Sequence, residues 1–329
     1  MNGFRCPKVA IVIPAYNQGK YLKRAATSAL KQEGCRCEVY IVDDCSTDDT
    51  PVICQRLREQ YKNLQVIHHE TNLGLGKNVD FCLRLPKEEF ILRLDSDDIL
   101  EPTFAVEALK VMEAHPQAGY VHVLTQTINL DDTLGSKRIL NRRKVYYSPE
   151  EALMRALSGY RVSANILMFR RTALEQVNYS DISLSFAEDY DLTVRIANQG
   201  WGNAYIPKRL ALYRQWPNSG NNRARRKLSE IEGLTHVFTH SLPSGFKRHN
   251  LPEAKLRSAR SKMARNQAAY TPWPLFSKGE KKELWAALSA LSGQSSMPIF
   301  KFFIHIGGNK MTKVFLRYKL KIKTLLKNF

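Results

Sequence analysis

The stretch Phe90-Ile-Leu-Arg-Leu-Asp-Ser-Asp-Asp98 joins an apolar run to three carboxylates within four residues. An apolar run of this length, bounded by polar residues, is typical of a buried β-strand. The acids follow at its carboxyl end, where open α/β sheets place their ligands. Asp95 and Asp97 stand two residues apart, so a tight turn can direct both at one point. Their oxygens suit Mg²⁺ or Mn²⁺; the alternative interpretation is a solvated turn with helix-capping aspartates.

Three further apolar runs precede this strand, and each is followed by a helical pattern. The predicted strands are Val9–Ile13, Val39–Val42 and Leu64–His68, and a helix from Pro102 follows the fourth strand. Four strand–helix units in the first 115 residues predict a parallel sheet with right-handed crossovers, which is half of a Rossmann-like nucleotide-binding fold. Neither a G-x-G-x-x-G nor a Walker A sequence follows the first strand, which disfavours a dinucleotide dehydrogenase or a P-loop NTPase.

The next hundred residues have a less regular pattern, which mixes alternating strands with short helices. Ser148-Pro-Glu-Glu is a capping-box sequence at a helix start, and Gly200 closes a later helix. The predicted elements are strands over 119–130, 165–169, 201–206 and 210–214 and helices that begin at Ser148, Thr172 and Glu188.

The charge of the chain is concentrated near its C-terminus. The 329 residues carry a net charge of +19. Residues 222–329 hold 22 Lys and Arg against 5 Glu, which is +17, and the preceding residues carry the other +2. We therefore expect a nearly neutral globular domain over 1–221, divided at about residue 115, and a basic, mostly helical extension over 222–329.

The last part of this extension has a pattern that favours a membrane surface. Residues 301–329 hold eight basic residues and no acid. Met311, Phe315, Tyr318, Ile322, Leu325 and Phe329 follow helical spacing, and a basic amphipathic helix fits an anionic bilayer surface. The alternative is a helix packed on the core. Nucleic acid is disfavoured as a partner, because few aromatic residues interleave with the basic ones and no RNA- or DNA-binding motif is present.

Targeting signals and cysteine usage bear on the compartment. The N-terminal residues lack the apolar core of a signal peptide, and no segment reaches the ~20 apolar residues of a membrane span. The six cysteines lie in the first quarter of the chain, and Cys35-Arg-Cys37 has the wrong gap for a zinc knuckle. We expect free thiols in a reducing cytoplasm, with the protein peripheral on the inner face of the cell membrane.

Six motifs, in order along the chain, together resemble the family 2 glycosyltransferases. The resemblance covers roughly residues 8–221 and implies the GT-A fold, an α/β, Rossmann-like mixed sheet flanked by helices. The motifs are Val-Ile-Pro-Ala-Tyr-Asn (12–17), Val-Asp-Asp-Cys-Ser-Thr-Asp-Asp-Thr (42–50), Asn-Leu-Gly-Leu-Gly-Lys (72–77), Leu-Asp-Ser-Asp-Asp (94–98), Phe-Ala-Glu-Asp-Tyr-Asp-Leu (186–192) and Tyr-Arg-Gln-Trp-Pro-Asn-Ser (213–219).

The resemblance implies transfer of a sugar, with inversion, from a nucleotide diphosphate donor, most simply a UDP-sugar, to a hydroxyl of a cell-surface or lipid-linked glycan. Asp43 would bind the base, and Lys77 a phosphate. Asp95, beside Ser96, would hold the ribose or the water shell of a Mn²⁺ or Mg²⁺ ion, and Asp97 would bind that ion. The base pocket would be lined by Pro14, Ala15, Tyr16 and Asn17.

The resemblance also implies that Asp189 acts on the acceptor side, with Glu188 beside it. A sugar hydroxyl is a poor nucleophile, so a carboxylate must take its proton as it attacks. The alternative for Asp189 is an acid placed at a helix N-terminus by the helix dipole. For Asp44, Asp48 and Asp49 we favour loop solvation and helix capping.

One departure from the family pattern is Trp216, which stands where the family often has a histidine that helps to hold the metal or the diphosphate. Packing is the favoured role for its side chain. Trp216 keeps open the alternative of a catalytically inactive sugar-nucleotide-binding protein. A nucleotidyltransferase is the other alternative, although Pro14-Ala-Tyr-Asn17 is not the glycine-rich phosphate loop that it would need.

Overall fold

A computed structural model of the chain describes residues 9–138, 140, 142–216 and 224–293. The chain divides into two compact units, which are described separately below. The first holds most of the residues up to 217, and the second holds residues 218–329 and the short segments Leu157–Gly159 and Ser185–Ala187. The predicted helix over Met311–Phe329 lies outside the described residues.

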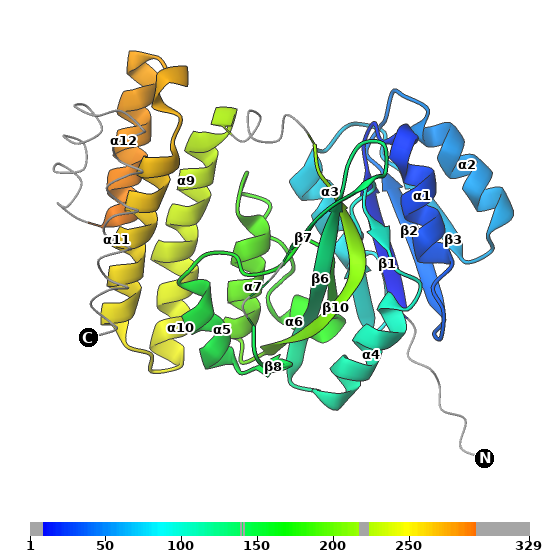
Figure 1. Cartoon of the computed structure of the whole chain (residues 1–329), viewed down its shortest axis with the longest axis horizontal. Helices are drawn as coiled ribbons and strands as arrows, with labels where there is room; N and C mark the ends of the chain where they lie inside the picture. Colours follow the sequence, from blue (N-terminus) through cyan, green and yellow to red (C-terminus); the bar gives the residue numbers. More distant parts are fainter. Residues whose placement is uncertain (1–8, 139, 141, 217–223, 294–329) are drawn as a thin grey trace. The chain divides into compact units, whose positions relative to one another are not determined.

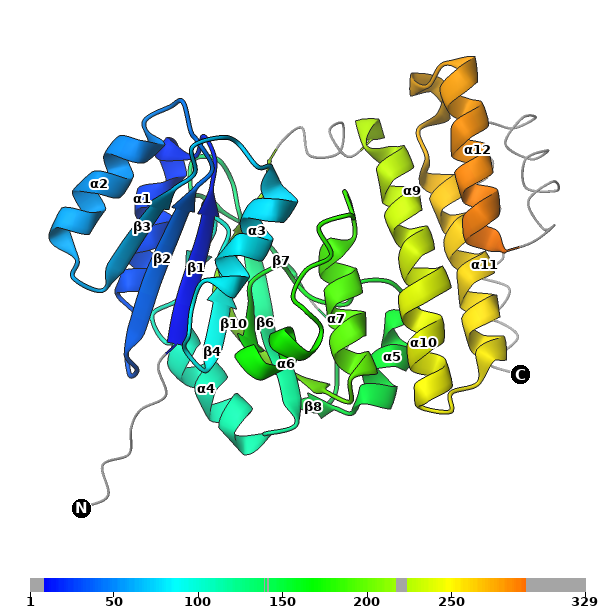
Figure 2. The same cartoon turned by 180° about the vertical axis from the view of Figure 1, so that it is seen from behind.

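The first unit is built on one mixed sheet, with strands in the order β3-β2-β1-β4-β9-β6-β10-β5. Its N-terminal half is parallel: β1 (Val9–Ala15) pairs with β2 (Cys37–Asp43) and β4 (Phe90–Arg93), and β2 pairs with β3 (Leu64–His68). β1 is buried along its whole length, as a continuous β-branched run predicts. Figure 2 shows these four strands side by side, in the order β3-β2-β1-β4.

Helices cover both faces of this sheet. α1 (Gly19–Leu30), α2 (Thr50–Gln60) and α4 (Phe104–Ala114) pack in one apolar core with Val9, Ile11 and Ile13 of β1. α3 (Leu75–Arg84), α6 (Arg171–Gln176) and α7 (Glu188–Asn198) pack in another core with Ala10 and Val12. Alternate residues of β1 thus face opposite layers, and Figures 1 and 2 show these two layers from opposite sides.

The second half of the sheet mixes strand directions. β9 (Leu167–Arg170) is antiparallel to both β4 and β6 (Ala118–Ile128), whereas β10 (Gly202–Arg214) is parallel to β6. The remaining elements are β5 (Ile99–Leu100), β7 (Leu134–Arg138), β8 (Tyr146–Tyr147) and α5 (Pro149–Ala156). Ser148 and Glu151 exchange the two hydrogen bonds of the predicted capping box. The α/β fold class with a mixed sheet is confirmed.

The prediction of two short strands at 201–206 and 210–214 is wrong, because β10 runs through both. Its register against β6 shifts between Ile206 and Arg209 and again between Arg209 and Ala211. Pro207 lies inside this irregularity. It lacks an N–H to donate and so breaks the ladder locally, which the sequence pattern presents as a gap between strands.

The described part of the second unit is helical. Its elements are α9 (Lys227–His236), a π-helical turn (Val237–Ser241), α10 (Leu242–Arg248), α11 (Glu253–Tyr270), a 3₁₀ turn (Trp273–Leu275) and α12 (Lys278–Ser292). α12 packs against α9 and α11, as Figures 1 and 2 both show. Ser277 and Glu280 form a capping box at the start of α12. Within the described ranges no helix combines the length and the apolar character of a membrane span.

Candidate active site

A cavity of about 410 Å³ opens at the carboxyl ends of β1 and β4. β1 supplies Pro14 and Ala15, and the turn after it supplies Tyr16, which is 48% exposed. The other residues that line the cavity are Gln18, Asp44, Asn72, Gly74, Leu75, Asn78, Asp95, Ser96 and Asp97. Five of the predicted donor-side residues therefore share this cavity with the predicted metal ligand Asp97.

The three acids after β4 differ in their hydrogen-bond partners. Asp95 accepts a hydrogen bond from Nε of Arg93 at 3.0 Å, and Asp97 accepts one from Nε1 of Trp216 at 2.7 Å. Oδ1 of Asp98 accepts from the backbone N–H of Arg214 at 2.8 Å. Oδ2 of Asp98 is buried and has no hydrogen-bond partner among the described residues.

The electrostatics of this acid cluster favour a bound cation. Burial raises the pKa of Asp97, and the Trp216 N–H opposes that rise. Burial, together with the charges of Asp97 and Asp95, raises the pKa of Asp98 well above its ordinary value. Carboxylates crowded in this way are stabilised by a hard divalent cation, and Asp95 and Asp97 both line the cavity. The donor set thus fits Mn²⁺ or Mg²⁺.

Trp216 contacts the acid cluster directly, which packing alone would not require. Trp216 is 38% exposed, and its ring lies edge-on to that of Tyr21, with ring centroids 5.5 Å apart. The neighbouring Arg214 is buried, with its guanidinium 4.2 Å from the centroid of the Tyr21 ring and its Nε donating to the carbonyl of Asp97 at 2.9 Å. The interpretation of Trp216 as a packing residue is therefore incomplete, because its indole N–H binds Asp97.

Asp44 holds the loop that forms one wall of the cavity. Its two carboxylate oxygens accept from the backbone N–H groups of Leu73 and Gly74, at 2.8 and 2.9 Å. Its carbonyl accepts from the side-chain amide of Asn72 at 3.0 Å. Gly74 has a φ of +84°, a conformation that an L side chain rarely adopts. The interpretation of Asp44 as a solvated or capping residue is wrong, since its buried carboxylate organises this loop and lines the cavity.

Three predicted donor-side residues lie outside the lining of this cavity. Oδ2 of Asp43 is 3.0 Å from Nδ1 of His68. Oδ1 of Asn17 accepts from the backbone N–H of Thr47 at 2.8 Å, which ties the turn after β1 to the loop after β2. Lys77 is exposed in the first turn of α3. Their roles at the donor stay predictions.

Asp189 lies in the first turn of α7, beside Glu188, where the helix dipole favours acids. Oδ1 of Asp189 accepts from Nη1 of Arg93 at 2.6 Å, and Asn165 provides a further side-chain hydrogen bond. Burial raises the pKa of Asp189, and the Arg93 guanidinium opposes that rise. Burial and then the charge of Asp189 raise the pKa of Tyr160.

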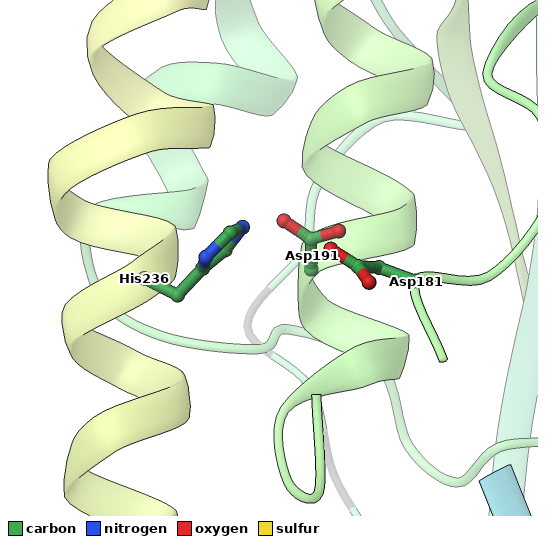
Figure 3. A group of neighbouring side chains, drawn as sticks. All are labelled: Asp181, Asp191 and His236. Carbon is green, nitrogen blue, oxygen red and sulfur yellow. The ribbon is translucent and has the colours of Figure 1, made fainter. Parts of the chain in front are cut away.

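A second pair of acids near α7 has a structural role. One carboxylate oxygen of Asp181 lies within 4.8 Å of one of Asp191. Figure 3 shows the two side chains next to each other. Nε of Arg195 donates to Asp191 at 2.6 Å, and the Asp181 carboxylate accepts from the backbone N–H of Ser183 at 2.9 Å. The same Arg195 donates to the carbonyls of Val177 and Tyr179, which ties the segment before α7 to the helix. His236, also drawn in Figure 3, belongs to the other unit.

One protein-family model matches the chain, over about half of its length. The model of "Glycosyl transferase family 2" matches residues 10–177. This range includes β1, the acid cluster and the loop held by Asp44. It ends before α7, so Asp189 lies outside it.

Curated relatives resemble this chain over part of their length. Chondroitin synthase of Escherichia coli is 32% identical over 196 residues, which are 60% of this chain and 27% of that protein. The poly(ribitol-phosphate) β-N-acetylglucosaminyltransferase TarS of Staphylococcus aureus is 36% identical over 111 residues, or 33% of this chain and 19% of that one. The matches thus span about a fifth to a third of the relatives' own length.

Solved structures share the fold over most of the chain. Residues 1–349 of TarS, solved with UDP, align with a TM-score of 0.54 at 20% identity and cover 88% of this chain and 93% of that one. The mannosyltransferase PcManGT of Pyrobaculum calidifontis, solved with GDP-Man and Mn²⁺, aligns with a TM-score of 0.56 at 18% identity and covers 88% of this chain and 87% of that one. The GT-A fold predicted from the sequence is confirmed.

Proposed function

The chain belongs to glycosyl transferase family 2, and from this membership we propose that it transfers a sugar from a nucleoside diphosphate donor to a hydroxyl acceptor with inversion at the anomeric carbon. The observation that carries the proposal is the cavity at the carboxyl ends of β1 and β4, lined by Tyr16, Asp95 and Asp97. Ligands of open α/β sheets bind at this edge. A volume of about 410 Å³ lies in the range of small-molecule sites.

The nucleotide occupies this cavity in our proposal. The exposed ring of Tyr16 provides a flat surface for the base, and Asp95 and Asp97 take the metal that binds the diphosphate. UDP is the first nucleotide to test, because TarS was solved with UDP and with UDP-GlcNAc. GDP is the second, because PcManGT was solved with GDP-Man and Mn²⁺. A bound divalent cation offsets the negative charge that gathers on the leaving diphosphate.

Asp189 is the general base of the proposed reaction. A base must be ionised to accept the acceptor's hydroxyl proton. Burial raises the pKa of Asp189, and the Arg93 guanidinium, which Asp189 contacts, opposes that rise and so favours the ionised form. Glu188 precedes it on α7 and stays the alternative base.

Two further proposals concern the chemical class of the acceptor and the compartment in which transfer takes place. Chondroitin synthase and TarS are named for polymeric products or acceptors, which supports a glycan or glycopolymer acceptor for this chain. The +17 charge of residues 222–329 supports a site of action next to an anionic membrane, on its cytoplasmic face. A lipid-linked glycan combines both expectations.

Turnover with a panel of UDP- and GDP-sugars in Mn²⁺, with release of the free nucleoside diphosphate as the readout, tests the proposal.

Asp189→Asn should retain donor binding but lose transfer by roughly 10²–10⁴-fold, the range for a lost general base. The matched control is Asp191→Asn, two residues along the same helix. Near-normal transfer by Asp189→Asn would indicate that Glu188, not Asp189, is the general base. Binding of a nucleotide sugar without turnover would favour the inactive binding protein. Release of pyrophosphate from a nucleoside triphosphate and a sugar 1-phosphate, assayed in parallel, would favour a nucleotidyltransferase.

A further inference from the structure

Arg93 joins the donor side of the candidate site to the acceptor side. It is the last residue of β4, and its side chain is only 5% exposed. Nε donates to Oδ1 of Asp95 at 3.0 Å, and Nη1 donates to Oδ1 of Asp189 at 2.6 Å. One guanidinium therefore holds two carboxylates, whose side chains are 28% and 18% exposed. One lies in the turn after β4 and the other at the start of α7.

The geometry of this contact is specific to arginine. A guanidinium is planar, stays charged at any physiological pH and presents several N–H groups in a fixed fork. Two different nitrogens of Arg93 serve the two acids, so the direction of each carboxylate is tied to the same rigid group. A lysine would place one ammonium between them and could not fix both directions.

We propose that Arg93 is a positioning residue for transfer: it sets the direction of the base Asp189 relative to the donor-side Asp95. The proposal rests on the proposed function, because it takes Asp189 as the base. Arg93 itself does not line the cavity. Its effect on the reaction passes through the direction of Asp189, so the loss of Arg93 should lower the rate of transfer more than the affinity for the nucleotide.

A double-mutant cycle on the full-length chain separates this role from a purely structural one. Steady-state kinetics are measured for wild type, Arg93→Gln, Asp189→Asn and the double variant, with the donor that wild type uses. Arg93→Gln should lower kcat at least tenfold and change the donor KM less than threefold. In the Asp189→Asn background the same substitution should change the residual kcat less than threefold, because the group that Arg93 positions is already lost.

Two further variants control for damage to the fold. Removal of one partner of a buried ion pair is strongly destabilising, so Arg93→Lys is made as well, and it should recover part of kcat over Arg93→Gln. Arg195→Gln is the matched control, because Arg195 bonds Asp191 at 2.6 Å on the same helix as Asp189. It should lower the melting temperature, keep kcat within about twofold, and have the same effect with and without Asp189→Asn.

The outcomes distinguish this inference from the proposed function. Effects of Arg93→Gln and Asp189→Asn that multiply in the double variant would overturn the inference, as would a kcat of Arg93→Gln equal to that of wild type. Both results leave the proposed function standing. Absence of transfer by wild type across the donor panel would overturn the proposed function and this inference with it.

Discussion

His122 is a buried histidine on β6 that stands apart from the cavity. It is 1% exposed, and neither ring nitrogen has a hydrogen-bond partner among the described residues. The centroid of its ring lies 5.1 Å from the centroid of the Tyr205 ring. Burial lowers the pKa of His122 well below its ordinary value, and the charge of Arg142 lowers it further. His122 is therefore neutral in the folded protein near pH 7.

This burial predicts a stability loss in acid. The pKa of His122 is lower in the folded than in the unfolded chain, so the unfolded chain takes up the proton first as the pH falls. Above about pH 6.5 His122 is neutral in both states and the free energy of unfolding does not depend on it. Below that pH the free energy of unfolding falls by about 1.4 kcal/mol per pH unit. Denaturant unfolding of wild type and His122→Phe between pH 7.5 and 5 measures the difference. Parallel pH profiles for the two proteins would contradict this account.

At the residue scale, the sequence predicts the acids but not their partners. The sequence places Asp95 and Asp97 at the carboxyl end of a strand, and the family resemblance assigns Asp189 to the acceptor side. Arg93 appears in the sequence as one polar residue in an apolar run, and its bond to Asp189 spans 96 positions. The bond from Trp216 to Asp97 spans 119 positions. Such contacts depend on how α7 and β10 return to β4, which local patterning does not determine.

At the element scale, the loop before α3 depends on one buried carboxylate. Asp44→Ala would leave the N–H groups of Leu73 and Gly74 without their protein acceptor, which costs about 0.5–1.5 kcal/mol for each of these partly buried hydrogen bonds. The variant should melt several degrees lower and bind the nucleotide more weakly, because this loop lines the cavity.

Calorimetry with UDP and thermal melts check this prediction. The control is Asp49→Ala, since Asp49 is exposed and its side chain makes no capping hydrogen bond at the start of α2. An Asp44→Ala protein that melts and binds like the Asp49→Ala protein would show that the loop is held by other contacts.

Helices and strands can be predicted from the hydrophobic pattern of the sequence where one face or the whole of the element is buried. The four N-terminal strands and their helices match the predictions to within a few residues, because apolar runs and helical periodicity both have tertiary partners in the same βα unit. The sequence pattern does not predict β5 and β7. β5 is apolar and buried but has only two residues, too few to show a strand pattern. Four of the five residues of β7 are exposed, so β7 carries no hydrophobic signal.

At the scale of the whole molecule, the uneven charge predicts membrane binding. Truncation before Lys310 removes seven basic residues and no acid: Lys310, Lys313, Arg317, Lys319, Lys321, Lys323 and Lys327. Each basic residue near an anionic surface contributes ~1 kcal/mol, so the full-length chain should sediment with phosphatidylserine vesicles at low salt and the truncated chain much less. Binding should weaken as salt rises and screens the charges.

Vesicles of neutral lipid are the control for this experiment. A truncated protein that still sediments with anionic vesicles, but melts many degrees lower, would indicate that the segment packs on the rest of the protein. An unchanged melting temperature with lost sedimentation would support membrane attachment.

The central claim is that the acid cluster after β4 binds a metal and, through it, a nucleoside diphosphate. Calorimetric titration of UDP and GDP into the full-length chain, in Mn²⁺ and in EDTA, tests it most directly when wild type is compared with Asp97→Asn. Wild type should bind one of the nucleotides, more tightly in Mn²⁺ than in EDTA. Asp97→Asn should fold, because Asp97 lies in a turn beyond β4, but should lose the Mn²⁺-dependent part of the affinity. Equal affinity of the two proteins in Mn²⁺, or no binding of either nucleotide by wild type, would contradict the claim.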